Sequence, residues 1–261
     1  MLVPESIIRK IIKDSLLKEI GFKKRFKLGL GRSSSVSSSS SNISNATSGE
    51  EANFGPSSSV ESSVSERAAR LGRELGIDPA WVYAEEAKES GHNPKAMAWN
   101  LHIAVKDTWA RKAGVNPMSN EQKEKFKQAG FPVGQTKSYY GADARRAFQK
   151  AYDISPAHAI IGGAWGLYQV LGAYSLPQYG SDASRWRSAF ESDAVSHSEK
   201  AFKKWIQEHG DAFKNAVNRG DYAYTTRKYY GAPNSSYQNF IAQHVQKFRR
   251  GQESSDDNRV V

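Results

Sequence analysis

The sequence predicts an α+β fold that is mostly α and carries a small β element. Helix start and stop signals recur along most of the 261 residues, strand signals are few and short, and a serine-rich tract divides the chain. These observations give four segments: a basic amphipathic arm over 1–32, a linker over 33–62, a folded domain over 63–251 and a polar tail over 252–261.

The arm is predicted to form an amphipathic helix that begins near Pro4 and stops at Gly21. Residues 1–32 hold nine basic and three acidic side chains, so +6 of the net charge of +10 lies there. Such a helix can pack on its own domain, dock on a partner protein, lie on a membrane surface or contact nucleic acid through phosphates without sequence specificity. We favour a partner protein over a membrane, because the apolar stripe contains no tryptophan.

Composition excludes several classes of protein. The serine-rich tract over 33–65 has too few apolar side chains to offset the entropy cost of ordering, so we expect a flexible linker. Cysteine is absent, which excludes disulfides and thiolate metal sites. We expect no transmembrane span and no secretory signal, since charged residues interrupt every apolar run before it reaches the required length.

The helices of the domain are predicted from their caps. Ser63 and Glu66 have the spacing of a capping box, and the helix that follows them stops at Gly76. Asp78 caps a second helix that ends at Gly91. Periodicity predicts further helices over 121–128, 142–152, 198–209, 211–218, 222–230 and 237–249, and Pro and Gly residues over 130–140 indicate a loop or small hairpin.

Three carboxylates lie within one turn near the end of the second helix: Glu85, Glu86 and Glu89. Their spacing alone does not identify an acid catalyst. The helix end favours Glu89, because the negative end of the helix dipole disfavours the charged form of a carboxyl group. If apolar side chains also cover it, such a group can donate a proton near neutral pH.

Four short stretches carry a resemblance to a known family: Glu89-Ser90-Gly91, residues 99–103, residues 163–170 and residues 227–233. In this order they resemble the sequence marks of the lysozyme-like superfamily. They are most similar to bacteriophage N-acetylmuramidase domains and more distantly to soluble lytic transglycosylases. The resemblance covers about residues 68–248 and implies a lysozyme-like catalytic domain.

The resemblance also implies roles for single residues. Glu89 matches the family's one catalytic acid, and Ser90 matches a hydroxyl that holds the acid or the sugar. Gln169 matches the glutamine that lines the cleft, and Tyr229 matches the tyrosine that faces the acid. The next residue in the family is usually asparagine, whereas this chain has Tyr230, which we count with the substrate-binding residues.

The glycine-rich stretch suggests a further substrate contact. Gly163 and Gly166 permit a tight backbone beside a substrate. Trp165 offers a flat face to a sugar ring or packs in the core, and we include it with the predicted substrate-binding residues. No motif nominates a second carboxylate, although Asp107, Asp143 and Asp153 lie in the interval where it would fall.

The expected function is cleavage of the β-1,4 bond between N-acetylmuramic acid and N-acetylglucosamine in peptidoglycan, by a muramidase or a lytic transglycosylase. The resemblance implies a phage protein that acts on the bacterial cell wall, and the arm suggests attachment to a virion or tail protein. The alternative is a non-catalytic virion structural or cell-wall-binding protein. We expect no metal, because the histidines lack ligand spacing, and no cofactor, since no phosphate-binding glycine loop is present. The absence of a Gly-X-Ser-X-Gly elbow argues against a Ser-His-Asp hydrolase.

Overall fold

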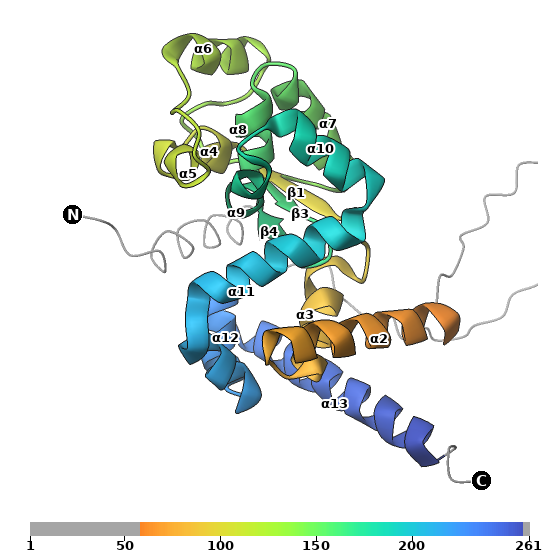
Figure 1. Cartoon of the computed structure of the whole chain (residues 1–261). Helices are drawn as coiled ribbons and strands as arrows, with labels where there is room; N and C mark the ends of the chain where they lie inside the picture. The colour runs from red at the N-terminus through yellow and green to blue at the C-terminus, as the bar shows by residue number, and fades with distance from the viewer. Residues whose placement is uncertain (1–57, 258–261) are drawn as a thin grey trace, which may run out of the picture.

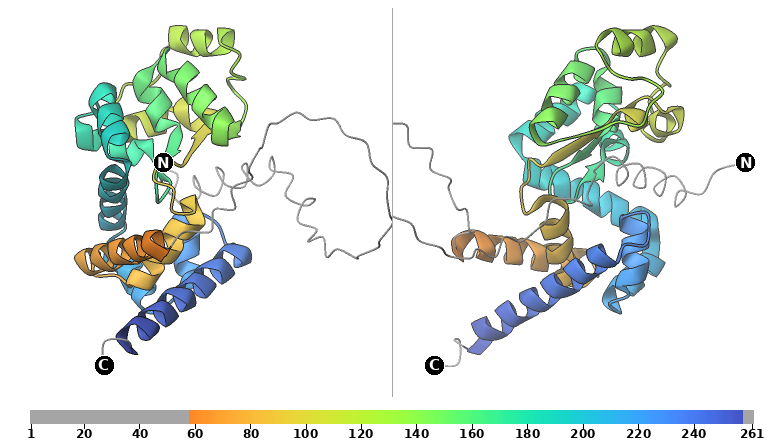
Figure 2. Two further views of the ribbon diagram at one scale, coloured as in Figure 1. Left: turned by 90° about the vertical axis from the view of Figure 1, so that its right-hand side faces the viewer. Right: turned by 180° about the vertical axis from the view of Figure 1, so that it is seen from behind.

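The computed structural model describes residues 58–257, so the predicted arm over 1–32 and most of the linker lie outside the described residues. The fold is α+β and mostly α, as predicted. Figures 1 and 2 show two lobes: α2 (Ser58–Leu75), α3 (Pro79–Ser90), α12 (Tyr222–Tyr229) and α13 (Ser235–Asp257) form one, and a small sheet with shorter helices forms the other. The long helix α11 (Ala194–Asn218) runs between them.

Helix α3 begins and ends at the residues that the sequence predicts. The Asp78 side chain caps it by accepting a hydrogen bond from the backbone N–H of Ala80 at 2.9 Å. Gly91 ends it in the left-handed conformation, with φ of 59°. Helix α3 packs against both α2 and α13.

Helix α2 begins earlier than predicted. It starts at Ser58, so Ser63 lies inside the helix and the predicted capping box is wrong. No glycine or proline interrupts residues 57–71, so the local sequence lets the helix run through Ser63 from an earlier start.

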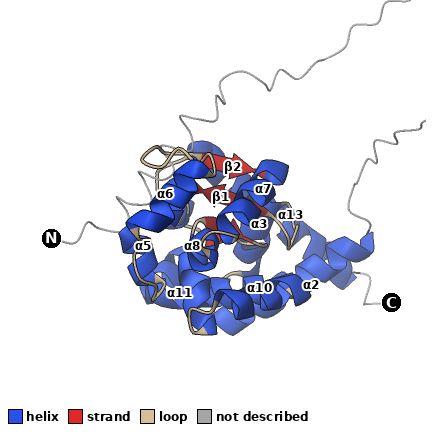
Figure 3. Ribbon diagram, turned by 90° about the horizontal axis from the view of Figure 1, so that it is seen from above, coloured by secondary structure: helices blue, strands red, loops and turns tan. Residues whose placement is uncertain are grey.

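The sheet is antiparallel and has the strand order β2-β1-β3-β4. Its strands are β1 (Met97–Asn100), β2 (Ser138–Tyr140), β3 (Gly163–Trp165) and β4 (Val170–Leu171). The register pairs Ala98 with Tyr140 on one side and with Ala164 on the other, and Ala164 pairs with Leu171. These four residues form one row across the sheet, which Figure 3 shows surrounded by helices. The stretch over 130–140, predicted as a loop or small hairpin, is a loop that leads into the single strand β2, which pairs with β1.

Shorter helices cover the sheet lobe: α4 (Leu101–Ala104), α5 (Asp107–Lys112), α6 (Asn120–Gln128), α7 (Gly141–Tyr152), α8 (Pro156–Ile161), α9 (Gly172–Ser175), the 3₁₀ helix η1 (Leu176–Tyr179) and α10 (Ala183–Ser192). The predictions over 121–128 and 142–152 are confirmed as α6 and α7. Helix α11 contains the two predicted helices over 198–209 and 211–218, joined at Gly210, whose φ of 65° lies outside the helical region.

Aromatic side chains fill both lobes. Trp81 of α3 contacts Phe202 of α11 at a ring distance of 6.2 Å and Tyr229 of α12 at 6.0 Å. This packing joins α3, α11 and α12 around one core. Among the described helices, none is both long and apolar enough to span a membrane.

Candidate active site

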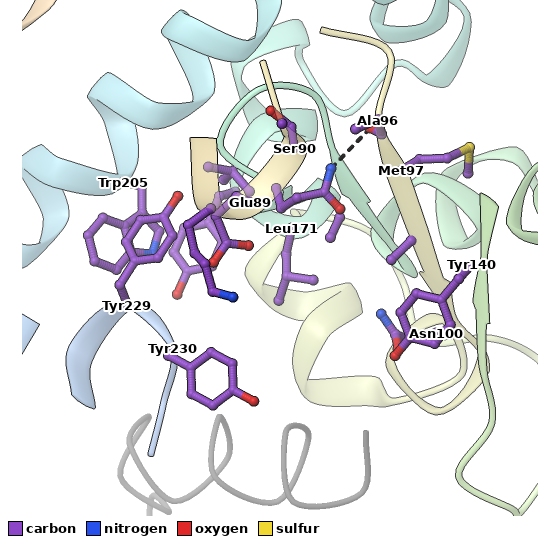
Figure 4. A pocket seen from close by; sticks show the side chains of 17 residues that line it. Glu89, Ser90, Ala96, Met97, Asn100, Tyr140, Leu171, Trp205, Tyr229 and Tyr230 are labelled. Carbon is purple, nitrogen blue, oxygen red and sulfur yellow. Dashed lines mark hydrogen bonds between the residues drawn. The ribbon is translucent and has the colours of Figure 1, made fainter. Parts of the chain in front are cut away.

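A cleft of about 430 Å³ opens between the end of α3 and the sheet. The in-register row of Ala98, Tyr140, Ala164 and Leu171 lines it, together with the last turn of α3 and aromatic side chains of α11 and α12. In Figure 4, Trp205, Tyr229 and Tyr230 lie at one side of the cleft, and Asn100 and Tyr140 lie at the other.

The three carboxylates of α3 have different surroundings. Glu85 and Glu86 are buried with no exposed surface. Glu89 is partly exposed and lines the cleft. The spacing in the sequence does not say which of the three is the acid catalyst. The packing of α3 against α2 and α13 places only Glu89, among these three, in the cleft lining.

Glu86 lies in a buried network. It forms an ion pair with Arg67, its carboxylate lies 3.0 Å from Nδ1 of His92, and it accepts a hydrogen bond from the Tyr168 hydroxyl at 3.1 Å. Burial acts to raise the pKa of Glu86, but the hydrogen bonds from His92 and Arg67 outweigh it and the pKa is lowered. Glu86 is therefore an ionised structural group that fixes α3 against α2 and the loop after α3.

Tyr237 of α13 holds Glu89. Its hydroxyl lies 2.7 Å from Oε1 of Glu89 and also contacts Oε2 of Glu85. Burial raises the pKa of Tyr237 well above its ordinary value, and the charges of Glu85 and Glu89 act in the same direction. Sequence reasoning assigns Tyr237 only to a helix; the spacing of aromatic residues on that helix is a core pattern and carries no sign of the contact with Glu89.

Gln169 lines the cleft as expected, and its side chain is bonded to the backbone. Its Nε2 donates hydrogen bonds to the carbonyls of Ala96 and Gly166, both at 3.0 Å, and Figure 4 shows the first of these. Gln169 also has a positive φ of 46°, which is uncommon for a residue other than glycine. The amide therefore ties the β3–β4 turn to the chain before β1.

Ser90, Tyr229 and Tyr230 all line the cleft. The Ser90 hydroxyl donates to the carbonyl of Glu86 at 3.0 Å, one turn back in α3. The Tyr229 hydroxyl donates to the carbonyl of Tyr168, whereas the hydroxyl of Tyr237 contacts the Glu89 carboxyl. Tyr230 is partly exposed and its ring lies 5.1 Å from that of Tyr237.

Trp165 lies in the core of the sheet lobe and does not line the cleft. It is 4% exposed, and its Nε1 donates to the carbonyl of Ile160 at 3.0 Å. Its ring contacts Trp186 at 4.7 Å and Phe148 at 4.8 Å. Trp165 therefore packs in the core and does not make the predicted sugar contact. Side chains alternate along a strand, so Trp165 points toward the helices while its neighbour Ala164 faces the cleft.

The three aspartates considered as a second carboxylate lie away from the cleft lining. Asp107 pairs with Lys123 at 3.9 Å, Asp143 pairs with Arg146, and Asp153 accepts a hydrogen bond from Gln149 at 2.7 Å. Within the described residues, Glu89 is the one acidic side chain that lines the cleft. No group of three or more His, Asp or Glu side chains there is arranged to hold a metal ion.

The architecture is that of a mostly helical α+β protein with a cleft between the end of α3 and a small sheet. Among solved structures, the chain is similar to the crystal structure of a Burkholderia AP3 phage endolysin. The match has a TM-score of 0.54 and 18% identity, and it covers 71% of each chain. At this identity the likeness shows the fold. No protein-family model and no curated protein matches the sequence.

Proposed function

We propose that this protein degrades peptidoglycan by cleaving the β-1,4 bond between N-acetylmuramic acid and N-acetylglucosamine, with Glu89 as the proton donor. The observation that carries the proposal is the position of the Glu89 carboxyl, which opens into the cleft while Glu85 and Glu86 are buried. The endolysin-like fold supports the same substrate class.

The reaction needs a proton at the leaving oxygen. Glu89 donates it as the C1–O bond breaks, and the carboxylate that remains faces the positive charge that develops on the sugar ring. In the hydrolytic route a water molecule attacks C1. In the transglycosylase route Glu89 takes the proton of the muramic acid's 6-hydroxyl, which closes a 1,6-anhydro ring.

The cleft lining favours the second route. Glycosidases commonly use two carboxylates, whereas ring closure by the substrate's own hydroxyl requires one. Glu89 supplies that one among the described lining residues, and Asp107, Asp143 and Asp153 are engaged elsewhere. Tyr230 and Tyr140 offer aromatic surface to the sugar rings at opposite sides of the cleft.

A digest of purified cell walls tests the proposal. The full chain should release soluble glycan fragments, and mass spectrometry of their ends should show 1,6-anhydro ends for a transglycosylase and reducing ends for a hydrolase. Glu89→Gln should abolish release with the fold intact. The matched control is Glu121→Gln on α6, whose side chain is 77% exposed and lies outside the cleft, and it should keep full activity.

Two results would contradict this function. Full activity of Glu89→Gln would remove that residue from its role, and release of free peptides without glycan cleavage would indicate a different bond specificity. A protein that sediments with cell walls but releases nothing would be a wall-binding protein, the alternative expected from the sequence. Attachment to a virion through residues 1–32 stays a prediction, because that arm lies outside the described residues.

A further inference from the structure

The hydroxyl of Tyr237 contacts two carboxyl groups of α3. Tyr237 contacts Oε1 of Glu89 at 2.7 Å and also Oε2 of Glu85. Glu85 has no exposed surface and lies one helical turn before Glu89 on α3. The lysozyme-like resemblance and the proposed reaction use neither Glu85 nor Tyr237.

The number of hydrogens decides what these contacts mean. A phenol has one hydrogen, and an ionised carboxylate only accepts hydrogen bonds. Tyr237 can therefore donate to Glu85 or to Glu89 but not to both. Burial raises the pKa of Tyr237 well above its ordinary value, so the phenol itself keeps its hydrogen. In the other of these two hydrogen bonds, the hydrogen must therefore be bound to a carboxyl oxygen, which donates it to the Tyr237 oxygen.

Several charged and titratable groups surround this end of α3. Arg67, from α2, and His92 are directed to Glu86. Lys88, on α3, lies 5.4 Å from the ring centre of Tyr237. From α12, the Tyr229 hydroxyl donates to a backbone carbonyl, and Tyr230 contacts the Tyr237 ring.

We propose that Glu85, Tyr237 and Glu89 form a proton-sharing unit, which holds one acid proton between its two carboxyls in the resting protein. In one arrangement Glu89 carries the proton and donates to the Tyr237 oxygen, while Tyr237 donates to Glu85. In the other Glu85 carries it, and Tyr237 donates to Glu89. A shift of two hydrogens along the chain of oxygens interconverts them and leaves the unit's charge at −1.

The use of this proton rests on the proposed function. When Glu89 gives its proton to the leaving oxygen, the C1–O bond breaks and the unit's charge becomes −2. The Tyr237 hydrogen is then available to the new Glu89 carboxylate. The proton taken from the 6-hydroxyl or from water returns the unit to −1, so protons balance over one turnover. Glu85 and Tyr237 act through Glu89 and are positioning residues.

Infrared difference spectroscopy of the full chain, without substrate and at neutral pH, tests the unit directly. The carbonyl stretch of a protonated carboxyl should be present in the wild type. It should be lost in Glu85→Gln and also in Glu89→Gln, because each amide can donate to Tyr237 and leaves the remaining carboxyl ionised. The matched control is Glu199→Gln, a buried glutamate that pairs with Arg70, and it should keep the band.

Four spectra would overturn the proposal: no such band in the wild type, a band that persists in both variants, a band lost only in Glu85→Gln, which would mean a proton held on Glu85 by burial alone, or a band lost only in Glu89→Gln, which would mean a proton held on Glu89 alone. If Glu85→Gln does not fold, Glu85→Met takes its place, because Tyr237 then donates to Glu89 alone and the band should again be lost. If the protein releases no fragments in the cell-wall digest but shows the expected band pattern, the proposed function is rejected and the proton-sharing unit is retained.

Discussion

The hydroxyl of Tyr237 lies 2.7 Å from Oε1 of Glu89, although 148 residues separate the two along the chain. Helix α13 packs along α3, and this contact fixes the carboxyl that faces the cleft. The position of the candidate acid thus depends on a helix from the far end of the folded domain.

Tyr237→Phe should therefore slow turnover without weakening substrate binding. Loss of one hydrogen bond that orients the acid costs about 1.4 kcal/mol in the transition state, so kcat should fall about tenfold with KM little changed. Steady-state kinetics on soluble peptidoglycan fragments measures both. Tyr230→Ala is the contrasting variant, because it removes a ring that lines the cleft and should raise KM. A rise in KM alone for Tyr237→Phe would contradict a positioning role.

Gly166→Ala should severely destabilise the turn beside the cleft. Gly166 has φ of 70°, and a Cβ there would lie 1.8 Å from Oγ of Ser198. Overpacking and backbone strain together should lower the free energy of unfolding by about 3 kcal/mol, as urea denaturation would measure. Gly180→Ala is the matched control, since its φ is 66° but a Cβ meets nothing within 4 Å, so it should cost about 1 kcal/mol. Equal losses would show that the Ser198 contact is unimportant.

Arg67→Met should destabilise the α2–α3 packing. The Arg67 and Glu86 side chains are 15% and 0% exposed, so removal of the cation leaves a buried carboxylate without its main counter-charge. The expected loss in unfolding free energy is about 3 kcal/mol. Arg146→Met breaks the ion pair with Asp143, where the side chains are 73% and 69% exposed, and should change stability little. A loss for Arg67→Met as small as for this control would contradict the structural role of Glu86.

Stability should fall on mild acidification through His197. Burial, with a smaller effect of Lys200, lowers the pKa of this histidine from 6.5 to about 4. The unfolded chain binds the proton more readily, so the contribution of His197 is fully present above pH 6.5 and is lost as the pH falls toward about 4. The loss is about 3 kcal/mol at most, and melting temperatures across this range would follow it.

Two variants isolate the contribution of His197. His197→Phe, which cannot take up a proton, should reduce the dependence of melting temperature on pH, and His102, whose pKa is also lowered by burial to about 4, should account for part of the remaining slope. Tyr179→Phe removes the hydroxyl that lies 2.9 Å from Nδ1 of His197 but keeps the imidazole, so it should retain the dependence. An unchanged slope in His197→Phe would assign the acid sensitivity to other groups.

Local chemistry made much of the fold predictable. Asp78 and Gly91 mark the ends of α3 because capping and a left-handed glycine act within a few residues. The predicted break between 209 and 211 is likewise Gly210. The strands were not predictable in this way, since β1 and β3 are short and are stabilised by pairing with strands that lie far away in the sequence. The start of α2 was missed because the spacing of Ser63 and Glu66 matches a capping box, although the helix runs through Ser63 from Ser58.

The residues of the candidate site also fall into those that local motifs predict and those that depend on tertiary packing. Glu89, Ser90, Gln169, Tyr229 and Tyr230 come from motifs, and the structure brings all five to one cleft. Tyr237 and the burial of Glu85 were not predictable, because both depend on how α13 lies against α3. Trp165 was uncertain from the sequence, since an aromatic residue in a strand serves a core or a surface equally well until the facing side is known.

The in-register row of Tyr140, Ala98, Ala164 and Leu171 constrains how this protein can diversify. Each strand gives one residue to the row, and side chains alternate between faces. An insertion or deletion of a single residue in any strand would turn its contribution away from the cleft. Exchange of side chains at fixed length keeps the row aligned, so new ligand preferences of the cleft should arise by point substitution there, while changes of length are confined to the connecting loops.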